Sequence, residues 1–298
     1  MQRVSIGEGH TISRLVYGMM RIKDAPDRSA AGLCAKLQAA LEVGITTVDH
    51  ADIYGGYSHE EFFGAAIRGT GLRDQIEIVT KCGIIYPGGP YGDVAMKHYD
   101  TTGAHIRASV DRSLRLLGTD RIDLFLIHRP DPLMDHHDAG AALDAVVKAG
   151  KVRAVGVSNF RPWDVGALQA AMQNRLAVNQ IELSLAAVAA FGNGDIPHLQ
   201  ERGMVPMAWS PIAGARLMAS ADDPTPLERI LDRIATAQGV GRAAVAVAWL
   251  LAHPSGIVPV LGSNQIDRIR AWPDALRVKI SRVDWFDLYT AAIGHGVP

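Results

Sequence analysis

The chain has 298 residues, of which 48% are hydrophobic and 20% charged, with a formal net charge of −1. This composition is typical of a globular protein, and the balanced charge, without a run of like charges, excludes the electrostatic signature of nucleic-acid-binding or anionic-lipid-binding proteins. Two cysteines are too few for a disulfide framework or a thiolate metal site, and the longest apolar run, residues 243–252, is far shorter than the roughly 20 residues that span a bilayer.

Short apolar runs alternate with amphipathic helical patterns along the whole chain, without a linker or a change in composition. The runs predict eight strands, at residues 15–20, 45–50, 76–81, 122–128, 152–158, 176–182, 204–210 and 257–262. Several, such as residues 122–127 and 152–157, are nearly continuously apolar, as expected for strands that are buried on both faces of a parallel sheet.

Local signals place helices between these strands. Residues 58–61 (Ser-His-Glu-Glu) and 225–228 (Thr-Pro-Leu-Glu) read as capping boxes, and Gly239 ends the second helix. An apolar stripe from Ile106 to Leu117, closed by Gly118, indicates a helix packed on a sheet. Eight βα units predict a parallel eight-stranded (β/α)8 TIM barrel that forms a single domain over residues 1–298, with an open doubly wound sheet as the alternative.

Polar side chains follow three consecutive predicted strands, at the end of a barrel where active sites lie. Asp49 and Lys81 are expected to meet, because a buried charge is costly unless it is paired. The Lys81 charge would lower the pKa of a neighbouring Tyr54 below its usual value of about 10. Tyr54 could then protonate a carbonyl oxygen that His128 holds by a hydrogen bond.

Each of these residues also has a structural interpretation. Asp49 and Lys81 could form a plain salt bridge, and His128 could be a satisfied core histidine. The other ten histidines are expected at the surface or in loops. His50 and Asp52 lie in the same loop as Asp49, but their spacing does not distinguish them from scaffold.

Residues 83–103 carry turn signals and aromatic side chains without periodicity, so we expect them to form a loop over the barrel mouth. This loop would set the substrate specificity. The expected pocket-lining side chains are Met19, Met20, Tyr57, Tyr86 and Phe191.

The chain contains, in this order, the motifs Asp49-x4-Tyr54-Gly55, Tyr57-Ser-His-Glu60, Val79-Thr-Lys81, Asp123-Leu-Phe-Leu-Ile-His128, residues 150–160 (Gly-Lys-Val-Arg-Ala-Val-Gly-Val-Ser-Asn-Phe), Asn179-Gln180 and Pro259-x-x-Gly262-Ser263. Together these motifs resemble the aldo-keto reductases over almost the whole chain. The resemblance implies a catalytic tetrad of Asp49, Tyr54, Lys81 and His128, with the tyrosine as general acid.

The resemblance also implies how a nicotinamide dinucleotide binds without a Rossmann glycine fingerprint, which the chain lacks. Ser158, Asn159 and Gln180 match positions that hydrogen-bond the carboxamide, and Trp209 matches the aromatic residue that stacks on the nicotinamide. The pyrophosphate would lie along the following loop, where the implied residues are Ser210, Pro211, Ala213, Gly214, Arg216 and Leu217.

A 2′-phosphate would be held near Gly262, Ser263, Asn264 and Arg268, because a guanidinium pairs well with phosphate. The chain departs from the family here: Gly262 replaces a polar residue, and Ala271 and Trp272 replace the acid and amide that often contact adenine. The resemblance implies NADP(H) as the cofactor, and these departures keep NAD(H) as an alternative.

The sequence thus predicts a cytoplasmic enzyme, a monomer or weak homo-oligomer, that uses NADPH to reduce small aldehydes or ketones to alcohols. We expect no metal, nucleic-acid or membrane partner. One alternative is a nucleotide-binding regulatory subunit of the same fold with little catalysis, and another is an enzyme that uses Lys81 as a Schiff-base nucleophile.

Overall fold

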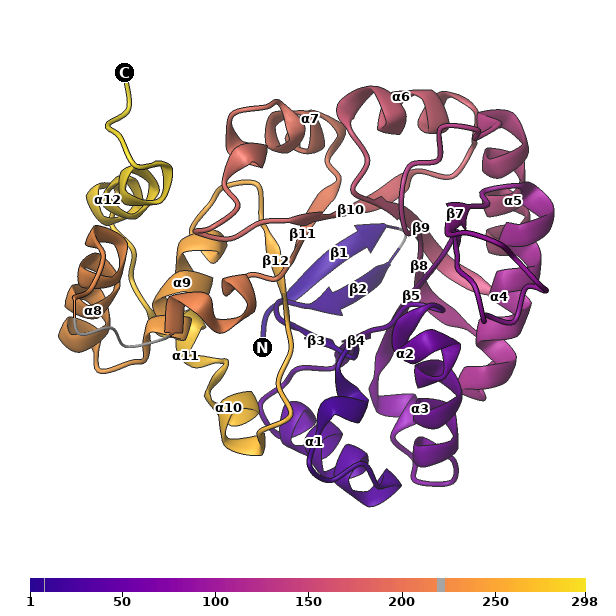
Figure 1. The fold of residues 1–298 in the computed structure, drawn as a ribbon, viewed down its shortest axis with the longest axis horizontal. Helices are drawn as coiled ribbons and strands as arrows, with labels where there is room; N and C mark the ends of the chain where they lie inside the picture. Colours follow the sequence, from indigo (N-terminus) through magenta and orange to yellow (C-terminus); the bar gives the residue numbers. More distant parts are fainter. Residues whose placement is uncertain (8, 219–222) are drawn as a thin grey trace.

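The barrel that the sequence predicts is present in the structure, a computed structural model that describes residues 1–7, 9–218 and 223–298, without the side chains of residues 215–217. Its strands are β3 (Val16–Gly18), β4 (Thr47–Asp49), β5 (Glu77–Cys82), β8 (Ile122–Ile127), β9 (Val152–Ser158), β10 (Leu176–Glu182), β11 (Val205–Trp209) and β12 (Val258–Leu261). All neighbours are parallel, and β12 pairs with β3 to close the ring, which rules out the open sheet (Figure 1).

Two strands, β9 and β10, coincide with the predicted apolar runs, whereas β3, β4 and β12 are shorter than theirs. The run at residues 15–20 contains the three-residue strand β3, yet Leu15 and Met19 on either side of it are fully buried. Apolar residues at the ends of a barrel strand pack under the covering helices without joining the ladder, so the apolar pattern extends beyond the paired residues.

Helices surround the barrel. They are α1 (Ala30–Glu42), α2 (Tyr54–Tyr57), α3 (His59–Ile67), α4 (Gly103–Leu117), α5 (His136–Lys148), α6 (Pro162–Ala170), α7 (Asp195–Arg202), α8 (Pro226–Gln238), α9 (Arg242–Leu251), α10 (Ile266–Ala271), α11 (Asp274–Arg277) and α12 (Arg282–Ile293). In Figure 1, α8 and α12 lie side by side outside α9, and both belong to the connections around the last two strands.

One of the two predicted capping boxes is confirmed. Thr225 and Glu228 bond reciprocally at the start of α8, with Pro226 in its first turn. At α3 the prediction was wrong: the Ser58 hydroxyl donates to the carbonyl of Gly55 instead of capping the helix. Ser58 has φ of −109° and ψ of −9°, in the helical region, whereas a capping residue is usually extended, so its hydroxyl does not cap the first amides of α3.

An N-terminal hairpin that the sequence analysis did not predict covers one end of the barrel. It consists of β1 (Arg3–Gly7) and β2 (His10–Ser13), and Ile12 is fully buried with the inward-facing strand residues. The Arg3 guanidinium donates to Glu77 at the start of β5. The hairpin therefore closes the amino-terminal end of the strands.

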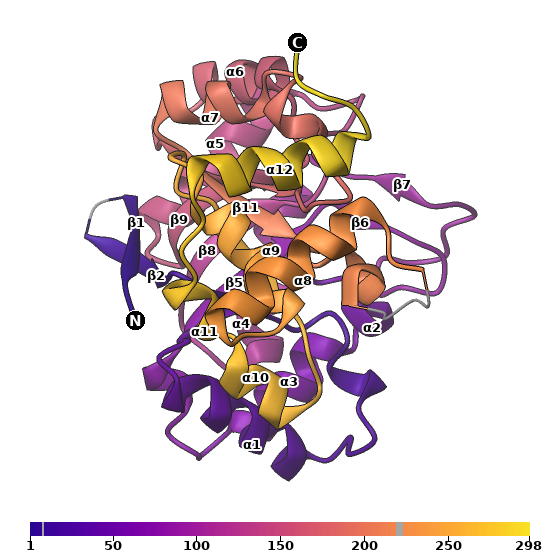
Figure 2. The same ribbon diagram turned by 90° about the vertical axis from the view of Figure 1, so that its left-hand side faces the viewer.

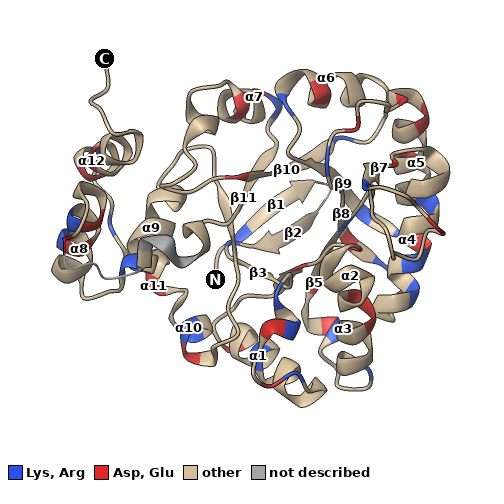
Figure 3. Ribbon diagram, in the orientation of Figure 1, with Lys and Arg blue, Asp and Glu red and all other residues tan. Residues whose placement is uncertain are grey.

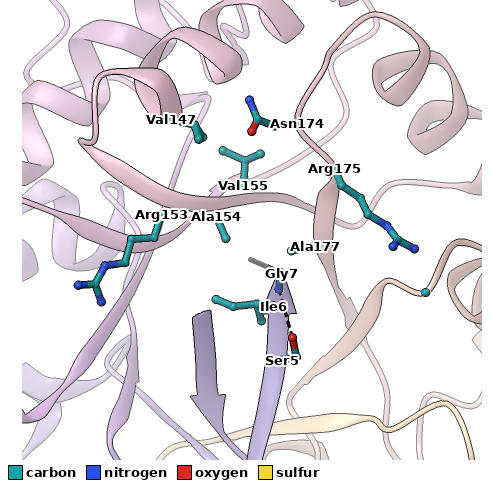
Figure 4. Close-up of a pocket in the computed structure, with 11 residues that line it drawn as sticks. Ser5, Ile6, Gly7, Val147, Arg153, Ala154, Val155, Asn174, Arg175 and Ala177 are labelled. Carbon is teal, nitrogen blue, oxygen red and sulfur yellow. Dashed lines mark hydrogen bonds between the residues drawn. The ribbon is translucent and has the colours of Figure 1, made fainter. Parts of the chain in front are cut away.

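A cavity of about 260 Å³ lies beside this hairpin, between Gly7 and the residues around Ala154 and Ala177 (Figure 4). Two arginines of its lining, Arg153 and Arg175, point away to either side. Because it opens at the amino-terminal end of the strands, this cavity is remote from the strand ends that carry the candidate catalytic residues.

The segment between β5 and α4 is more ordered than expected. It contains a short antiparallel pair, β6 (Ile84–Ile85) and β7 (His98–Tyr99), which brackets irregular residues 86–97. Figure 2 shows β7 at the opposite side of the molecule from the N-terminal hairpin. The longest irregular stretch of the predicted loop is thus residues 86–97, with Gly83 and residues 100–102 as short connections on either side.

Basic and acidic residues are interspersed along the outer helices (Figure 3). Within the described ranges, no single helix has the length and apolarity to cross a membrane; α8 and α9 meet that test only as a pair bent by 95°.

Candidate active site

Lys81 joins the predicted polar groups at the carboxyl-terminal end of β5. Its ammonium lies 2.8 Å from both carboxylate oxygens of Asp49 at the end of β4, so the predicted ion pair is present. It also donates to the carbonyl of His50 at 2.7 Å and lies 3.4 Å from the hydroxyl of Tyr54. Lys81 is fully buried and Asp49 nearly so, and the pair is further tied down by Gln180, whose amide donates to Asp49 at 2.8 Å.

This environment keeps Lys81 charged. Burial by itself lowers its pKa, but the charges of Asp49 and Tyr54 and its hydrogen bonds to them outweigh burial, and the pKa of Lys81 is raised. A Schiff-base lysine needs the opposite, a neutral and accessible amine. The burial of Lys81 and its pairing with Asp49 therefore speak against the Schiff-base alternative.

The predicted direction of the Tyr54 pKa was wrong for the protein alone. Burial raises the pKa of the Tyr54 phenol above its usual value, and the Lys81 charge offsets only part of this rise. The sequence showed that a cation is near, but not how completely the phenol is desolvated.

His128 follows β8, with its ring 6.1 Å from that of Tyr54 and at 79° to it. Burial, followed by the charges of Lys81 and Arg129, lowers the pKa of His128 well below its usual range. Its buried Nδ1 has no hydrogen-bond partner among the described residues. A neutral imidazole with a free ring nitrogen beside Tyr54 can hydrogen-bond a bound oxygen atom.

The residues that the resemblance assigned to a carboxamide are adjacent at the ends of β9, β10 and β11. The Asn159 amide group donates to Ser158 at 2.8 Å, and its oxygen accepts from the indole of Trp209 at 3.0 Å. The Ser158 hydroxyl donates to the carbonyl of Gln180 at 2.8 Å. One connected network therefore holds these four side chains next to Asp49, which Gln180 contacts.

The loop after β11 has an unusual backbone. Ser210 and Ala213 both adopt left-handed conformations, with φ of 52° and 53°, although neither is glycine. Pro211 between them is buried, Gly214 is exposed, and the 3-10 helix η4 (Ala213–Met218) follows. The predicted contacts of Arg216 and Leu217 concern side chains outside the described ones. Strained backbone of this kind is concentrated at ligand sites.

The predicted phosphate residues follow β12. Asn264 donates to the carbonyl of Arg21 at 2.8 Å, and the Ser263 hydroxyl accepts from the amide of Gln265. Gly262 is exposed, and a Cβ at this position would be in ordinary contact with the carbonyl oxygen of Gly18 at 3.8 Å; Arg268 is exposed on α10. Among the described residues no ion pair involves Arg268, so its guanidinium is available to an anion.

Three of the five expected pocket residues are packed against other parts of the protein. Met19 is fully buried in the core, and Tyr57 is 5% exposed with its hydroxyl bonded to the carbonyl of Ile84. Phe191 packs outside the barrel, 5.3 Å from the ring of Trp249. Apolar residues near a predicted strand end can pack inward or outward, and the sequence pattern does not separate these cases.

The other two expected pocket residues are exposed. Met20 is 50% exposed and Tyr86 42% exposed, which leaves both side chains accessible to a ligand. The histidine prediction needs correction as well: His59 and His105 are buried and lie in helices, whereas His50, although buried, lies in a loop as expected.

Two nearby residues were not predicted. The Arg129 guanidinium lies 6.0 Å from the ring of Trp209, and its position directly after His128 was the signal in the sequence. Asp52 is buried beside the site, which no local pattern indicates. In the described part of the chain, no group of three or more His, Cys, Asp or Glu side chains could hold a metal ion.

Comparison with known proteins gives consistent results. A family model described as "Aldo/keto reductase family" matches residues 14–290. A protein of Agrobacterium fabrum named 6-dehydroglucose reductase is 56% identical over 298 residues and covers all of both chains. A protein of the same name from Novosphingobium aromaticivorans is 38% identical, over 97% of this chain and 95% of its own. Oxidoreductase YdhF of Escherichia coli is 40% identical over the full length of both.

Solved structures show the same fold. A thermostable aldo-keto reductase in complex with the inhibitor epalrestat matches with a TM-score of 0.81 and 26% identity, over 98% of this chain and 100% of that one. A glycerol dehydrogenase of Gluconobacter oxydans matches with a TM-score of 0.85 over 99% and 97%, and its 22% identity makes this a likeness of fold. The family model covers most of the chain, and two of the relatives match it over their full length. The chain therefore belongs to the aldo-keto reductase family and is an oxidoreductase.

Proposed function

We propose that this enzyme reduces an aldehyde or ketone to an alcohol with NADPH, and that Tyr54 is the general acid. The contact between the Tyr54 hydroxyl and the ammonium of Lys81, itself paired with Asp49, carries the proposal. A phenol beside a fixed positive charge can release its proton and leave a stabilised phenolate. The other alternative, a regulatory subunit, has no observation in its favour.

The chemistry of the donor set fits a nicotinamide cofactor. Gln180 uses its amide nitrogen to bond Asp49, which leaves its amide oxygen as an acceptor for a carboxamide, and the ring of Trp209 offers a stacking surface on the neighbouring strand. The two amide hydrogens of Asn159 are bonded to Ser158 and to the carbonyl of His128, so Asn159 would have to exchange one of them to bind the cofactor. The left-handed backbone at Ser210 and Ala213 leaves the exposed Gly214 free for close approach by a phosphate.

The proton that the carbonyl oxygen needs would come from a residue of the chain itself. When bound, the cofactor supplies the hydride that adds to the carbonyl carbon. Tyr54 donates its phenolic proton to the carbonyl oxygen, and the neutral His128 orients that oxygen by a hydrogen bond. The Lys81 charge then stabilises the phenolate left on Tyr54, while Asp49 and Gln180 hold Lys81 in place.

The names of the relatives suggest the substrate class. Two full-length relatives are named 6-dehydroglucose reductase, one of them 56% identical. We therefore propose a hydroxylated, sugar-like aldehyde as substrate, with 6-dehydroglucose as the first compound to assay.

Tyr54→Phe tests the acid. Loss of reduced-nicotinamide absorbance is followed with 6-dehydroglucose and a panel of simple aldehydes. We expect kcat to fall about 10²- to 10⁴-fold in the variant, with nucleotide binding retained, because only the proton donor is removed. Tyr289→Phe in α12 is the matched control. Undiminished turnover by Tyr54→Phe, or no turnover by the wild type on any carbonyl, would refute the proposal.

Arg268→Gln tests the preference for NADPH. A charge-assisted bond to phosphate is worth about 1.5–3 kcal/mol, so the KM for NADPH should rise roughly tenfold to hundredfold while that for NADH stays the same. Arg270→Gln on the same helix is the control, since Arg270 already pairs with Glu42 at 2.9 Å. Equal effects on the two cofactors would show that Arg268 does not contact a 2′-phosphate.

A further inference from the structure

Asp52 is a buried carboxyl group next to the candidate catalytic residues that the reaction above does not use. It is 1% exposed, and its amide donates to the carbonyl of Lys81 at 3.0 Å. One carboxyl oxygen accepts from the phenol of Tyr91 at 3.1 Å, and the other has no hydrogen-bond partner among the described residues. Tyr91 belongs to the irregular residues 86–97, so this bond fastens that segment to the barrel.

An aromatic cage surrounds the Tyr91 ring. The centroid of the Tyr91 ring lies 5.4 Å from that of Tyr57 and 4.9 Å from that of His105, and both contacts are edge-on. Tyr86 stacks on the Tyr57 ring with a centroid distance of 6.1 Å. The Arg112 guanidinium lies 5.7 Å and 5.9 Å from the ring centroids of Tyr57 and Tyr91. These contacts join the segment to α2 and α4, beneath an otherwise exposed surface.

The cage is rigid at its base. Tyr57 has a left-handed φ of 66°, which a bulky residue adopts only when its surroundings hold it there. The Tyr57 hydroxyl donates to the carbonyl of Ile84 at 2.7 Å. Gly89 lies directly against the Tyr57 ring, and a Cβ on Gly89 would lie only 2.5 Å from a ring carbon, so a residue with a side chain would not fit at this position. The segment is therefore shaped to fit over Tyr57.

Burial and the neighbouring carboxyl group of Glu60 favour the neutral form of Asp52. Burial, and then the charge of Glu60, raises the pKa of Asp52 to about 8, while the Tyr91 hydrogen bond and the Arg112 charge oppose this rise. Glu60 itself accepts hydrogen bonds from Thr80 and Ser113. The phenol of Tyr91 is the donor, and a carboxyl oxygen can accept in the neutral as well as in the charged form, so the bond does not depend on the protonation of Asp52.

Tyr54 lies in the chain between the two residues that hold this segment, Asp52 and Tyr57. From this geometry we propose that Asp52 and Tyr91 are positioning residues that fasten residues 86–97 over the barrel mouth and so complete the substrate-binding side of the site. The inference rests on the proposed function for its kinetic consequence, but the fastening itself is a property of the structure.

Tyr91→Phe tests the proposal, since it removes one hydroxyl and keeps the ring in its cage. We expect the KM for the aldehyde to rise roughly five- to tenfold, with kcat and nucleotide affinity within about twofold, because one hydrogen bond is lost. Amide hydrogen exchange in residues 86–97 should quicken by a similar factor. Tyr99→Phe, at the edge of the same segment, is the matched control and should leave both readouts unchanged.

Variants of Asp52 identify the partner. Asp52→Asn keeps an acceptor for Tyr91 and resembles the neutral acid, so it should stay near the wild type, whereas Asp52→Ala should match Tyr91→Phe. The double variant Asp52→Ala/Tyr91→Phe should be no worse than either single one. Unchanged exchange and KM in Tyr91→Phe, or additive effects in the double variant, would overturn the proposal. If the wild type turns over no carbonyl, the proposed function fails, and hydrogen exchange alone decides whether Asp52 and Tyr91 fasten the segment.

Discussion

Three acceptors surround the ammonium of Lys81: the Asp49 carboxylate, the carbonyl of His50 and the hydroxyl of Tyr54. A buried charge is tolerated when it is paired and fully hydrogen-bonded, and this arrangement meets both conditions. The same arrangement fixes the distance between the charge and the phenol, so the proton transfer proposed for Tyr54 would depend on residues from two neighbouring strands.

At the residue scale, the pKa directions predict the pH dependence. The raised pKa of Tyr54 keeps the phenol protonated through the neutral range, and the acid form is lost only as the pH rises through that value. His128 stays neutral because its pKa is lowered. We expect carbonyl reduction to be flat across neutral pH and to fall in alkali, whereas alcohol oxidation should rise with pH. Rates of both directions measure this, and an inflection near the ordinary histidine value of about 6.5 would contradict it.

At the scale of elements, glycine sets how closely two barrel helices approach. Gly64 in α3 faces α4, and a Cβ at this position would lie 2.2 Å from the carbonyl oxygen of Leu116. The contact is with backbone, which cannot rotate away as a side chain can. The α3 and α4 helices can therefore pack at this distance only around a residue without a side chain.

Gly64→Ala should accordingly lower the free energy of unfolding by about 2 kcal/mol, within the range for overpacked cores. Urea unfolding followed by circular dichroism measures the change. Ala65→Ser, at the next and exposed position of the same helix, should stay within about 0.5 kcal/mol of the wild type. A stability equal to that of the wild type in Gly64→Ala would mean that the two helices can move apart at little cost.

At the scale of the whole molecule, the N-terminal hairpin and the barrel share one core. Ile12 is fully buried with Val79, Leu124 and other inward-facing strand residues. The hairpin is thus a plug whose apolar face completes the barrel interior, and its removal would expose that interior to water at the end opposite the candidate active site.

Graded truncation of Ile12 tests whether the plug belongs to the cooperative unit. Ile12→Val should cost about 1 kcal/mol and Ile12→Ala about 3 kcal/mol, because methyl groups are removed from a close-packed site. Calorimetry should show one transition in each variant, displaced in Tm but not split. A separate low-temperature transition, or no effect of Ile12→Ala, would show that the hairpin unfolds independently of the barrel.

The sequence by itself determined the barrel and part of the site. Continuous apolar runs separated by helical periodicity predict a parallel sheet covered by helices, and Asp49, Lys81 and His128 each stand at the end of such a run. Strand ends of a parallel barrel converge on one mouth, so the Asp49–Lys81 pair could be predicted from one-dimensional positions. The capping box at Thr225 could also be predicted, because it depends only on two residues three positions apart in the chain.

Only the tertiary structure decided how deeply each group is buried and which distant residues it meets. The pKa of Tyr54 depends on the balance between desolvation and the Lys81 charge, and that balance needs three-dimensional burial. Phe191 was expected in the pocket but packs outside the barrel, and Tyr91 reaches Asp52 across 39 positions. Such contacts are set by packing between elements that are far apart in the chain, and no local pattern of residue types records them.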